Sequence, residues 1–137
     1  MKVIALRGAQ NTGKSHTINI VYQLILQAGY TQVPGVFRIL GNPKQEDVFD
    51  VFIRGDVRVG IIGMGDYVKG LGSLKALLQE MVHHGCEVVV CSCQSNPKIE
   101  NAVVQYSHQW VDKTLSTGIG NERIVNGIDA ARCFSFI

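Results

Sequence analysis

The stretch from residue 3 to residue 28 constrains the fold more than any other part of the chain. Four apolar residues, 3–6, have the pattern of a strand buried on both faces. Gly8 and Gly13 follow, and from Lys14 onward apolar residues recur at helical spacing until Gly29 supplies a stop. A strand, a glycine-containing turn and a long helix are therefore expected here, which is how an α/β arrangement begins.

The turn has a sequence that suits phosphate. Residues 8–15 read G-A-Q-N-T-G-K-S, the spacing G-x-x-x-x-G-K-S, between the predicted strand and the predicted helix. Gly8 and Gly13 allow backbone conformations in which successive N–H groups, including those of Asn11 and Thr12, turn inward around an anion. The helix start adds the positive end of its dipole. The sequence thus predicts a nucleotide-phosphate site.

Four residues after the second glycine complete this prediction. Lys14 is expected to reach the β- and γ-phosphates, and the Ser15 hydroxyl is expected to bind a Mg²⁺ ion that bridges them. His16 and Thr17 are expected to offer backbone N–H groups near the α-phosphate. No role is assigned to the side chains of His16 and Thr17.

A metal ion on a triphosphate also needs an acidic residue. The best candidate is Asp66, which follows the apolar run 57–62 after a glycine-rich stretch. Asp66 is therefore expected to bind Mg²⁺ and to share the catalytic role with Lys14; capping of the next turn or helix is the other role open to it. Asp50 and Asp56 are weaker candidates, because Asp56 falls in a predicted hairpin turn at the opposite end of the sheet.

The rest of the chain alternates strand and helix patterns. We expect an antiparallel hairpin over residues 48–53 and 57–62, followed by a helix over 70–84 that Gly85 ends and a buried strand over 88–91. After these we expect a helix over 97–106 capped by Asn96, a final strand over 109–115, and a last helix over 126–136 capped by Asn126. Residues 30–46 are expected to be mostly loop, with a short extended piece open as an alternative at 36–40. The predicted fold class is α/β: a three-layer, mostly parallel sheet of about five strands with one antiparallel hairpin strand, in a single nucleotide-binding domain over residues 1–137.

Composition excludes several function classes. The 13 Lys and Arg residues are spread among 11 Asp and Glu, for a net charge of +2, so nothing indicates a nucleic-acid partner. The N-terminal apolar stretch is broken by Arg7, which predicts no signal peptide or membrane segment and a cytoplasmic protein. The four cysteines are expected to be reduced and buried as small apolar side chains rather than to bind metal with His83 and His84: Cys86, Cys91, Cys93 and Cys133.

Through residues 8–15 and, more loosely, Asp66, the chain resembles the P-loop NTPase superfamily. The hairpin before the Asp66 segment looks like the arrangement in small GTPases. The N/T-K-x-D motif with which those proteins read guanine is missing after the next strand, where residues 92–98 read S-C-Q-S-N-P-K. The resemblance therefore implies ATP as the nucleotide. The chain is also similar to small bacterial ATP-binding proteins of no assigned activity, which supports only the fold and the ligand.

Three functions remain open. The leading hypothesis is Mg²⁺-dependent binding of ATP with slow hydrolysis, stimulated by a protein partner or by a second copy of the chain, since no convincing base or arginine finger is evident. The chain also resembles small-molecule and nucleotide kinases in size, with an acceptor between Asp66 and residues 92–96, but it has no Arg-rich lid; Arg38, Lys44 and Arg123 are the cations of the long connectors. A nucleotide-binding interaction module without turnover is the third.

Overall fold

The computed structural model describes residues 1–118 and 120–137 of the chain. Within these residues the strands are β1 (Lys2–Gly8), β2 (Thr31–Gln32), β3 (Arg38–Leu40), β4 (Asp47–Arg54), β5 (Val57–Ile62), β6 (Val88–Gln94) and β7 (Ser107–Asp112). The helices are α1 (Lys14–Gln27), α2 (Leu74–His83), α3 (Pro97–Val104) and α4 (Glu122–Ser135), with a short 3-10 helix, η1, at Pro43–Gln45.

All seven described strands join one sheet, in the order β2-β4-β5-β6-β1-β7, with β3 also pairing with β4. The neighbours β5-β6, β6-β1 and β1-β7 are parallel, whereas β4 is antiparallel to β5, β2 and β3. The prediction of a mostly parallel sheet of about five strands was wrong. The sheet is mixed, because residues 31–32 and 38–40 of the expected loop pair with the outer side of β4.

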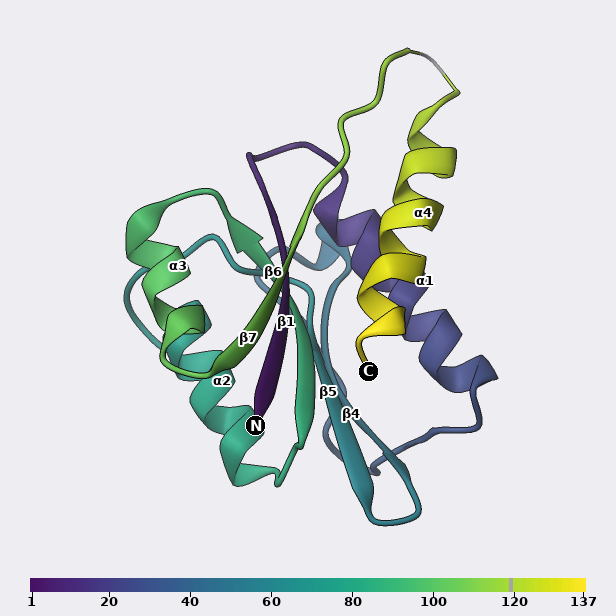
Figure 1. The fold of residues 1–137 in the computed structure, drawn as a ribbon. Coiled ribbons are helices and arrows are strands. Elements are labelled where there is room, and N and C mark those ends of the chain that lie inside the picture. Colours follow the sequence, from purple (N-terminus) through teal and green to yellow (C-terminus); the bar gives the residue numbers. More distant parts are fainter. Residues whose placement is uncertain (119) are drawn as a thin grey trace.

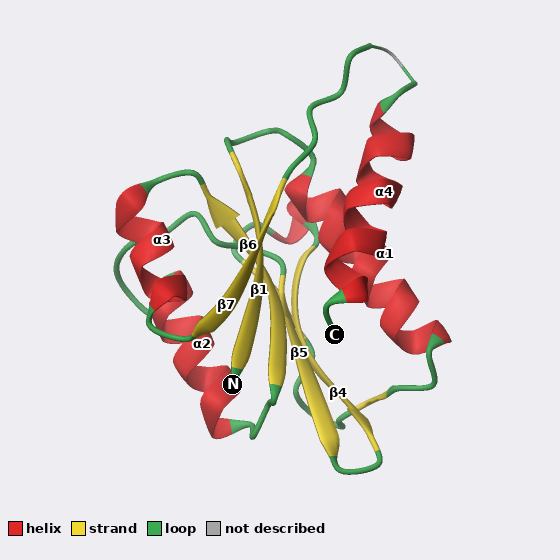
Figure 2. Ribbon diagram, in the orientation of Figure 1, coloured by secondary structure: helices red, strands yellow, loops and turns green. Residues whose placement is uncertain are grey.

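The helices cover the two faces of the sheet in pairs (Figures 1 and 2). Helices α1 and α4 lie against each other on one face, and α2 and α3 lie on the other. Alternate residues of β1 face opposite sides of the sheet. Val3 and Ala5 belong to the core under α2 and α3, and Ile4 and Leu6 belong to the core under α1 and α4. The predicted three-layer α/β arrangement is therefore present.

Two predicted helices begin at other residues in the structure, and the predicted helix ends differ by one or two residues. Helix α2 begins at Leu74 rather than Gly70, because the Ser73 hydroxyl accepts a hydrogen bond from the Ala76 N–H and so caps the helix. Helix α4 begins at Glu122, so the prediction that Asn126 caps it was wrong. Asn126 lies inside the helix and is buried. At the end of this helix Phe136 and Ile137 pack against the α1/α4 core, as the apolar C-terminal pattern predicts.

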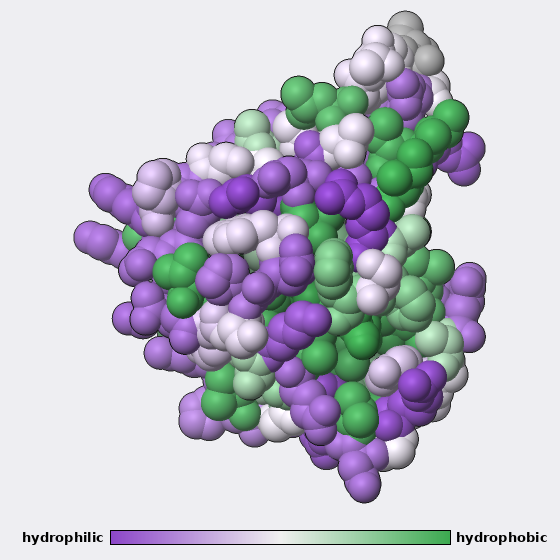
Figure 3. Space-filling model, viewed as in Figure 1, coloured by the Kyte–Doolittle hydropathy of each residue, from purple (hydrophilic) through white to green (hydrophobic). Residues whose placement is uncertain are grey.

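The surface mixes polar and apolar residues, as Figure 3 shows for one face. The most exposed large apolar side chains are Leu71, Leu115 and Ile124. No helix among the described residues has both the length and the apolar character needed to cross a membrane.

Candidate functional site

The predicted phosphate loop connects α1 to β1, which lies between β6 and the edge strand β7. Asn11 and Gly13 have left-handed backbone conformations, with φ of 59° and 90°. Gly13 occupies the N-cap position of α1, and no side chain caps the N–H groups of the first turn. These N–H groups therefore stay available at the positive end of the helix dipole, as an anion site requires.

Lys14 folds back over this loop. Its side chain is buried, and its Nζ donates a hydrogen bond to the Ala9 carbonyl at 2.6 Å. The Thr12 hydroxyl donates to the same carbonyl at 2.8 Å. Burial lowers the pKa of the Lys14 ammonium, while the negative charges of Asp66 and, more weakly, Asp47 raise it. The ammonium is thus held at the loop by a single neutral carbonyl, which a phosphate oxygen can replace.

Ser15 is paired with a carboxylate that the sequence analysis missed. The Ser15 Oγ donates to Asp47 Oδ1 at 2.5 Å. Asp47 is the first residue of β4, and because β4 runs antiparallel to β5, its beginning lies at the same edge of the sheet as the ends of β5 and β6. Sequence patterns point to acids at the ends of parallel strands, whereas Asp47 begins an antiparallel strand, so its position in the sequence does not indicate the site.

Burial raises the pKa of the Asp47 carboxyl, the Ser15 hydrogen bond partly offsets this, and the charge of Asp66 adds to it. The side chain is only 4% exposed, so a carboxylate here lacks full hydration. A divalent cation placed against it would replace the missing solvation.

Asp66 reaches the same site from the loop after β5. It is exposed, it lines the same cleft as the phosphate loop, and its charge acts on both Lys14 and Asp47. The strand before it, β5, is not adjacent to β1, because β6 lies between them. The structure therefore brings the predicted acid to the phosphate loop from one strand further away.

Gly63 and Gly65 hold this Asp66 loop between β4 and β6. The Gly63 N–H donates to the Val48 carbonyl at 2.7 Å, and the Gly65 carbonyl accepts from the Gln94 N–H at 3.0 Å. A Cβ on Gly65 would lie 1.8 Å from the Ser92 carbonyl oxygen. The glycines therefore allow the backbone to pass between two strands.

The two weaker acidic candidates serve the scaffold. Asp50 is fully buried and accepts hydrogen bonds from Tyr22 at 2.7 Å, Gln32 at 2.8 Å and the Val51 N–H at 2.8 Å. Asp56 is exposed in the turn between β4 and β5, at the opposite end of these strands from Asp47. Asp50 and Asp56 are therefore separate from the site around Lys14.

Of the other residues predicted from the sequence, some line the cleft and some are engaged elsewhere in the protein. Thr17 is buried and its hydroxyl donates to the Gly13 carbonyl at 2.8 Å, so only the backbone of Thr17 is left to contact a ligand. His16 is exposed and lines the cleft. Among the connector cations, Lys44 and Arg123 line the cleft, whereas Arg38 pairs with Glu80 at 2.6 Å.

A buried ion pair forms part of the support behind the phosphate loop. Lys113 follows β7, and a Cβ on Gly8 would lie 3.0 Å from the Lys113 Cβ. The Lys113 Nζ lies 3.0 Å from Asp129 Oδ2, with both side chains fully buried. Burial acts to raise the pKa of Asp129, but hydrogen bonds from the Thr114 N–H and hydroxyl and from Lys113 hold it below its usual value. Lys113 is thus neutralised by a fixed carboxylate.

These elements enclose an open cleft of about 1280 Å³. Its lining combines the phosphate loop with residues from η1, β4, the Asp66 loop, β6 and α4, namely residues 10–16, 19, 20, 44, 46, 47, 63, 66, 92, 115, 116, 122, 123, 125 and 126. Its lining carries both cations and carboxylates, as a site for a metal-bound polyanion needs.

The oxygens at the β4 side of this cleft have the chemistry that Mg²⁺ prefers. The Ser15 hydroxyl and the Asp47 and Asp66 carboxylates are hard oxygen ligands, and Mg²⁺ usually combines one or two carboxylates with phosphate oxygens and water. No group of three or more His, Cys, Asp or Glu residues capable of holding a metal occurs among residues 1–118 and 120–137. The donor set therefore fits Mg²⁺ that arrives with a phosphate ligand.

The four cysteines are buried, as expected from the sequence. All four are free and buried: Cys86, Cys91, Cys93 and Cys133. Burial raises the pKa of Cys86 to about 11 and that of Cys93 to about 12, so both stay protonated at neutral pH. The cysteines are apolar packing residues.

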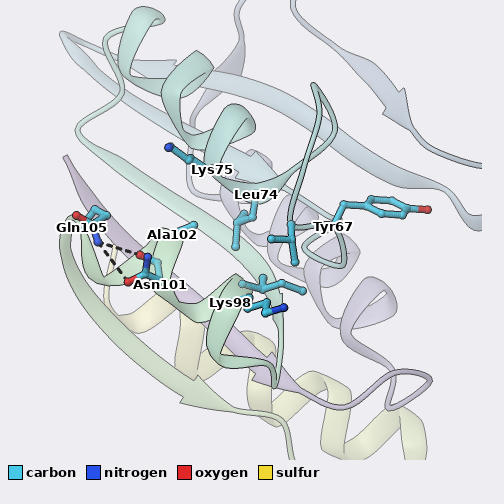
Figure 4. Close-up of a pocket in the computed structure, with 9 residues that line it drawn as sticks. Tyr67, Leu74, Lys75, Lys98, Asn101, Ala102 and Gln105 are labelled. Carbon is cyan, nitrogen blue, oxygen red and sulfur yellow. Dashed lines mark hydrogen bonds between the residues drawn. The ribbon is translucent and has the colours of Figure 1, made fainter.

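A second, smaller cavity of about 440 Å³ lies beside α2 and α3 (Figure 4). Tyr67 and Val68, which directly follow Asp66, form one wall, and Ile99 and Ala102 of α3 form another. Lys75 and Lys98 stand at its rim. The segment after Asp66 thus connects the large cleft to a second concave surface.

The chain matches no protein-family model, no curated protein and no solved structure. Its site is therefore interpreted from its own residues and their geometry.

Proposed function

We propose that the chain binds a nucleoside triphosphate, ATP in the first place, together with Mg²⁺, and hydrolyses it slowly. The observation that carries this proposal is the joining of two parts at one place. The phosphate loop has left-handed Asn11 and Gly13 and a helix start without a side-chain cap, and its Ser15 hydroxyl is bonded to the buried Asp47 carboxylate. The first part suits phosphate oxygens and the second suits their metal ion.

Each residue has a role in this proposal. Lys14 exchanges its Ala9 carbonyl for phosphate oxygens, and Ser15 with Asp47 and Asp66 holds the metal shell. Mg²⁺ supplies charge neutralisation on the β- and γ-phosphates. Positioning and charge are most of what phosphoryl transfer needs from a protein.

Slow hydrolysis is expected because neither carboxylate beside Lys14 and Ser15 is poised to activate water. Asp47 is already engaged with Ser15, and Asp66 is exposed at the rim. The cations Lys44, in η1, and Arg123, at the start of α4, also line the cleft. A protein partner, or a second copy of the chain, that fixes these two side chains against the phosphates would raise the rate.

Calorimetric titration with Mg²⁺-ATP tests this proposal. The wild-type chain is expected to bind, and Lys14→Ala is expected to lose at least about tenfold in affinity, because a charged hydrogen bond to phosphate is removed. Lys69→Ala is the matched control, since Lys69 is an exposed lysine outside the cleft. Equal binding by wild type and Lys14→Ala, or no binding by wild type, would overturn the proposal. Binding without any phosphate release would leave the non-hydrolysing module as the function.

A kinase is the second candidate, and the cavity in Figure 4 favours it. The acceptor place expected between Asp66 and residues 92–96 is partly closed by the hydrogen bond from the Gln94 N–H to the Gly65 carbonyl. The cavity lined by Tyr67 offers an alternative place for an acceptor with apolar and anionic parts, given Ile99 and Lys98 in its lining. Formation of ADP above the level without acceptor, in a screen of nucleosides, nucleotides and sugars, would select the kinase.

A further inference from the structure

The large cleft has two chemically different ends. Asp47 and Asp66 lie at one end, on β4 and after β5. Leu115, Arg123 and Asn126 lie at the other end, after β7 and on α4. In the sheet these strands stand on opposite sides of β1, with the phosphate loop between them. If metal and terminal phosphate occupy the acidic end, the nucleoside has to extend toward β7 and α4.

Asn126 is an unusual residue for the interior of a helix at this second end. It is only 7% exposed, and it lines the cleft. Its Oδ1 lies 2.9 Å and its Nδ2 3.3 Å from the position that a Cβ on Gly13 would occupy, so its amide group is held directly against the phosphate loop. A larger residue than glycine at position 13 would collide with this amide.

The amide of Asn126 makes no side-chain hydrogen bond with any described residue. Asp129, one turn further along α4, has both carboxylate oxygens bonded to Thr114 and Lys113. No side-chain N or O atom in the described part of the chain is both sealed from solvent and without a partner. The polar atoms of Asn126 therefore keep contact with the cleft. A buried amide is costly unless a partner satisfies it, which points to a partner supplied from the cleft.

We propose that the Asn126 amide binds the nucleoside part of the nucleotide, by accepting a hydrogen bond from an adenine amino group and donating one to the adjacent ring nitrogen. This inference rests on the proposed function. Asparagine offers a donor and an acceptor side by side, which is the complement of the N6/N7 edge of adenine. Guanine presents two acceptors at the same edge, O6 and N7, and satisfies only half of the amide.

The test compares Mg²⁺-ATP with Mg²⁺-triphosphate, which lacks the nucleoside, by calorimetric titration. Asn126→Leu keeps the size of the side chain and Asn126→Ala removes it. Both are expected to lose at least about fivefold in affinity for ATP, to keep their affinity for triphosphate within about twofold, and to lose preference for ATP over GTP. Gln79→Leu is the control, because it removes an exposed amide from α2, outside the cleft.

Each outcome separates one explanation from another. Equal losses for ATP and triphosphate would overturn the inference and assign Asn126 to the phosphates or to the shape of the loop. Unchanged ATP affinity in both variants would overturn it outright. Failure of the wild-type chain to bind either ligand would instead overturn the proposed function, and the inference with it.

Discussion

Asp47 carries a buried carboxylate that destabilises the folded state and suits a metal ligand in the site. Its carboxylate is buried at the beginning of β4 and has one hydrogen bond, from Ser15. Asp129 is equally buried but is satisfied by Thr114, Lys113 and its ion pair. The pKa of Asp47 is raised and that of Asp129 is lowered. Of these two carboxylates, Asp47 has fewer partners among the described residues for its negative charge, which suits a metal ligand.

Asp47→Asn is expected to weaken Mg²⁺-ATP binding by about 10- to 100-fold while stabilising the free protein. Asparagine still accepts the Ser15 hydrogen bond but cannot neutralise a cation. Because the pKa of Asp47 is higher in the folded than in the unfolded chain, the wild type loses stability as the pH rises through the folded pKa. Thermal unfolding should therefore show a higher Tm for the ligand-free variant at pH 7, and the gap should close as the pH falls toward 4.

Asp56→Asn serves as the control for this prediction, because Asp56 is an exposed carboxylate in the hairpin turn. It should change neither Mg²⁺-ATP binding nor the pH dependence of the Tm. A lower Tm for Asp47→Asn across the pH range would mean that the carboxylate is satisfied in the free protein, contrary to this argument.

At the level of residues, the sequence could predict the site residues that are contiguous in the chain, but not those that only folding brings together. Residues 8–15 carry their own spacing, and strand and helix patterns flank them, so the loop between β1 and α1 was predicted correctly. Asp47 and Asn126 lie 32 and 111 residues from Ser15 (47 − 15 and 126 − 15) and have no recognisable spacing to it. Asn126 even had a plausible local role as a helix cap. Only the pairing of strands and the packing of α4 on α1 bring these two residues to the loop.

Among the elements, the Asp66 loop depends on two glycines whose role is steric. The loop continues β5 between the beginning of β4 and the end of β6, with a backbone hydrogen bond to each side. A Cβ on Gly63 would lie 2.8 Å from the Val48 nitrogen, which is backbone and cannot move aside cheaply. The position of Asp66 relative to Lys14 is therefore set by backbone packing.

Gly65→Ala is expected to reduce the free energy of unfolding by roughly 3 kcal/mol, because the added methyl group would collide with the Ser92 carbonyl at 1.8 Å. Gly127→Ala is the matched control in α4, where an added Cβ meets no atom within 4 Å. It should stabilise the chain by about 0.5–1 kcal/mol through helix propensity. Urea denaturation measures both, and equal midpoints for the two variants would contradict the steric role of Gly65.

The helices and strands were predicted where a local sequence signal exists, and they were missed where strand pairing determines them. The hairpin of β4 and β5 and the caps of α3 were predicted, since turn and cap residues act locally. The strands β2 and β3 were not expected to form a sheet edge, because each is short and is held by antiparallel pairing with β4. The placement of β6 between β1 and β5 is likewise a property of the whole sheet, which no segment encodes alone.

At the scale of the whole molecule, the candidate site draws on both ends of the chain. The phosphate loop comes from residues 8–15, the acidic end from residues 47 and 66, and the opposite end from residues 115–126. The Lys2 side chain also donates to the Phe136 carbonyl at 2.9 Å, which ties the first strand to the end of the last helix. A ligand in the cleft would therefore contact elements that are remote in sequence, and its binding would depend on the complete fold.

Mg²⁺-ATP is expected to shift one cooperative unfolding transition rather than part of it. Neighbouring residues of β1 alternate between the two cores, so neither pair of helices can leave the sheet without exposing the strand that carries the phosphate loop. At a ligand concentration 100 times the Kd, binding should add about 2.7 kcal/mol to the free energy of unfolding, a rise in Tm of roughly 5–10 °C. Calorimetry should show a single peak that moves as a whole, that moves much less with ATP and a chelator, and that moves at most about half as far for Lys14→Ala. Two peaks, of which only one responds, would mean that the two cores unfold separately and that the ligand stabilises just one of them.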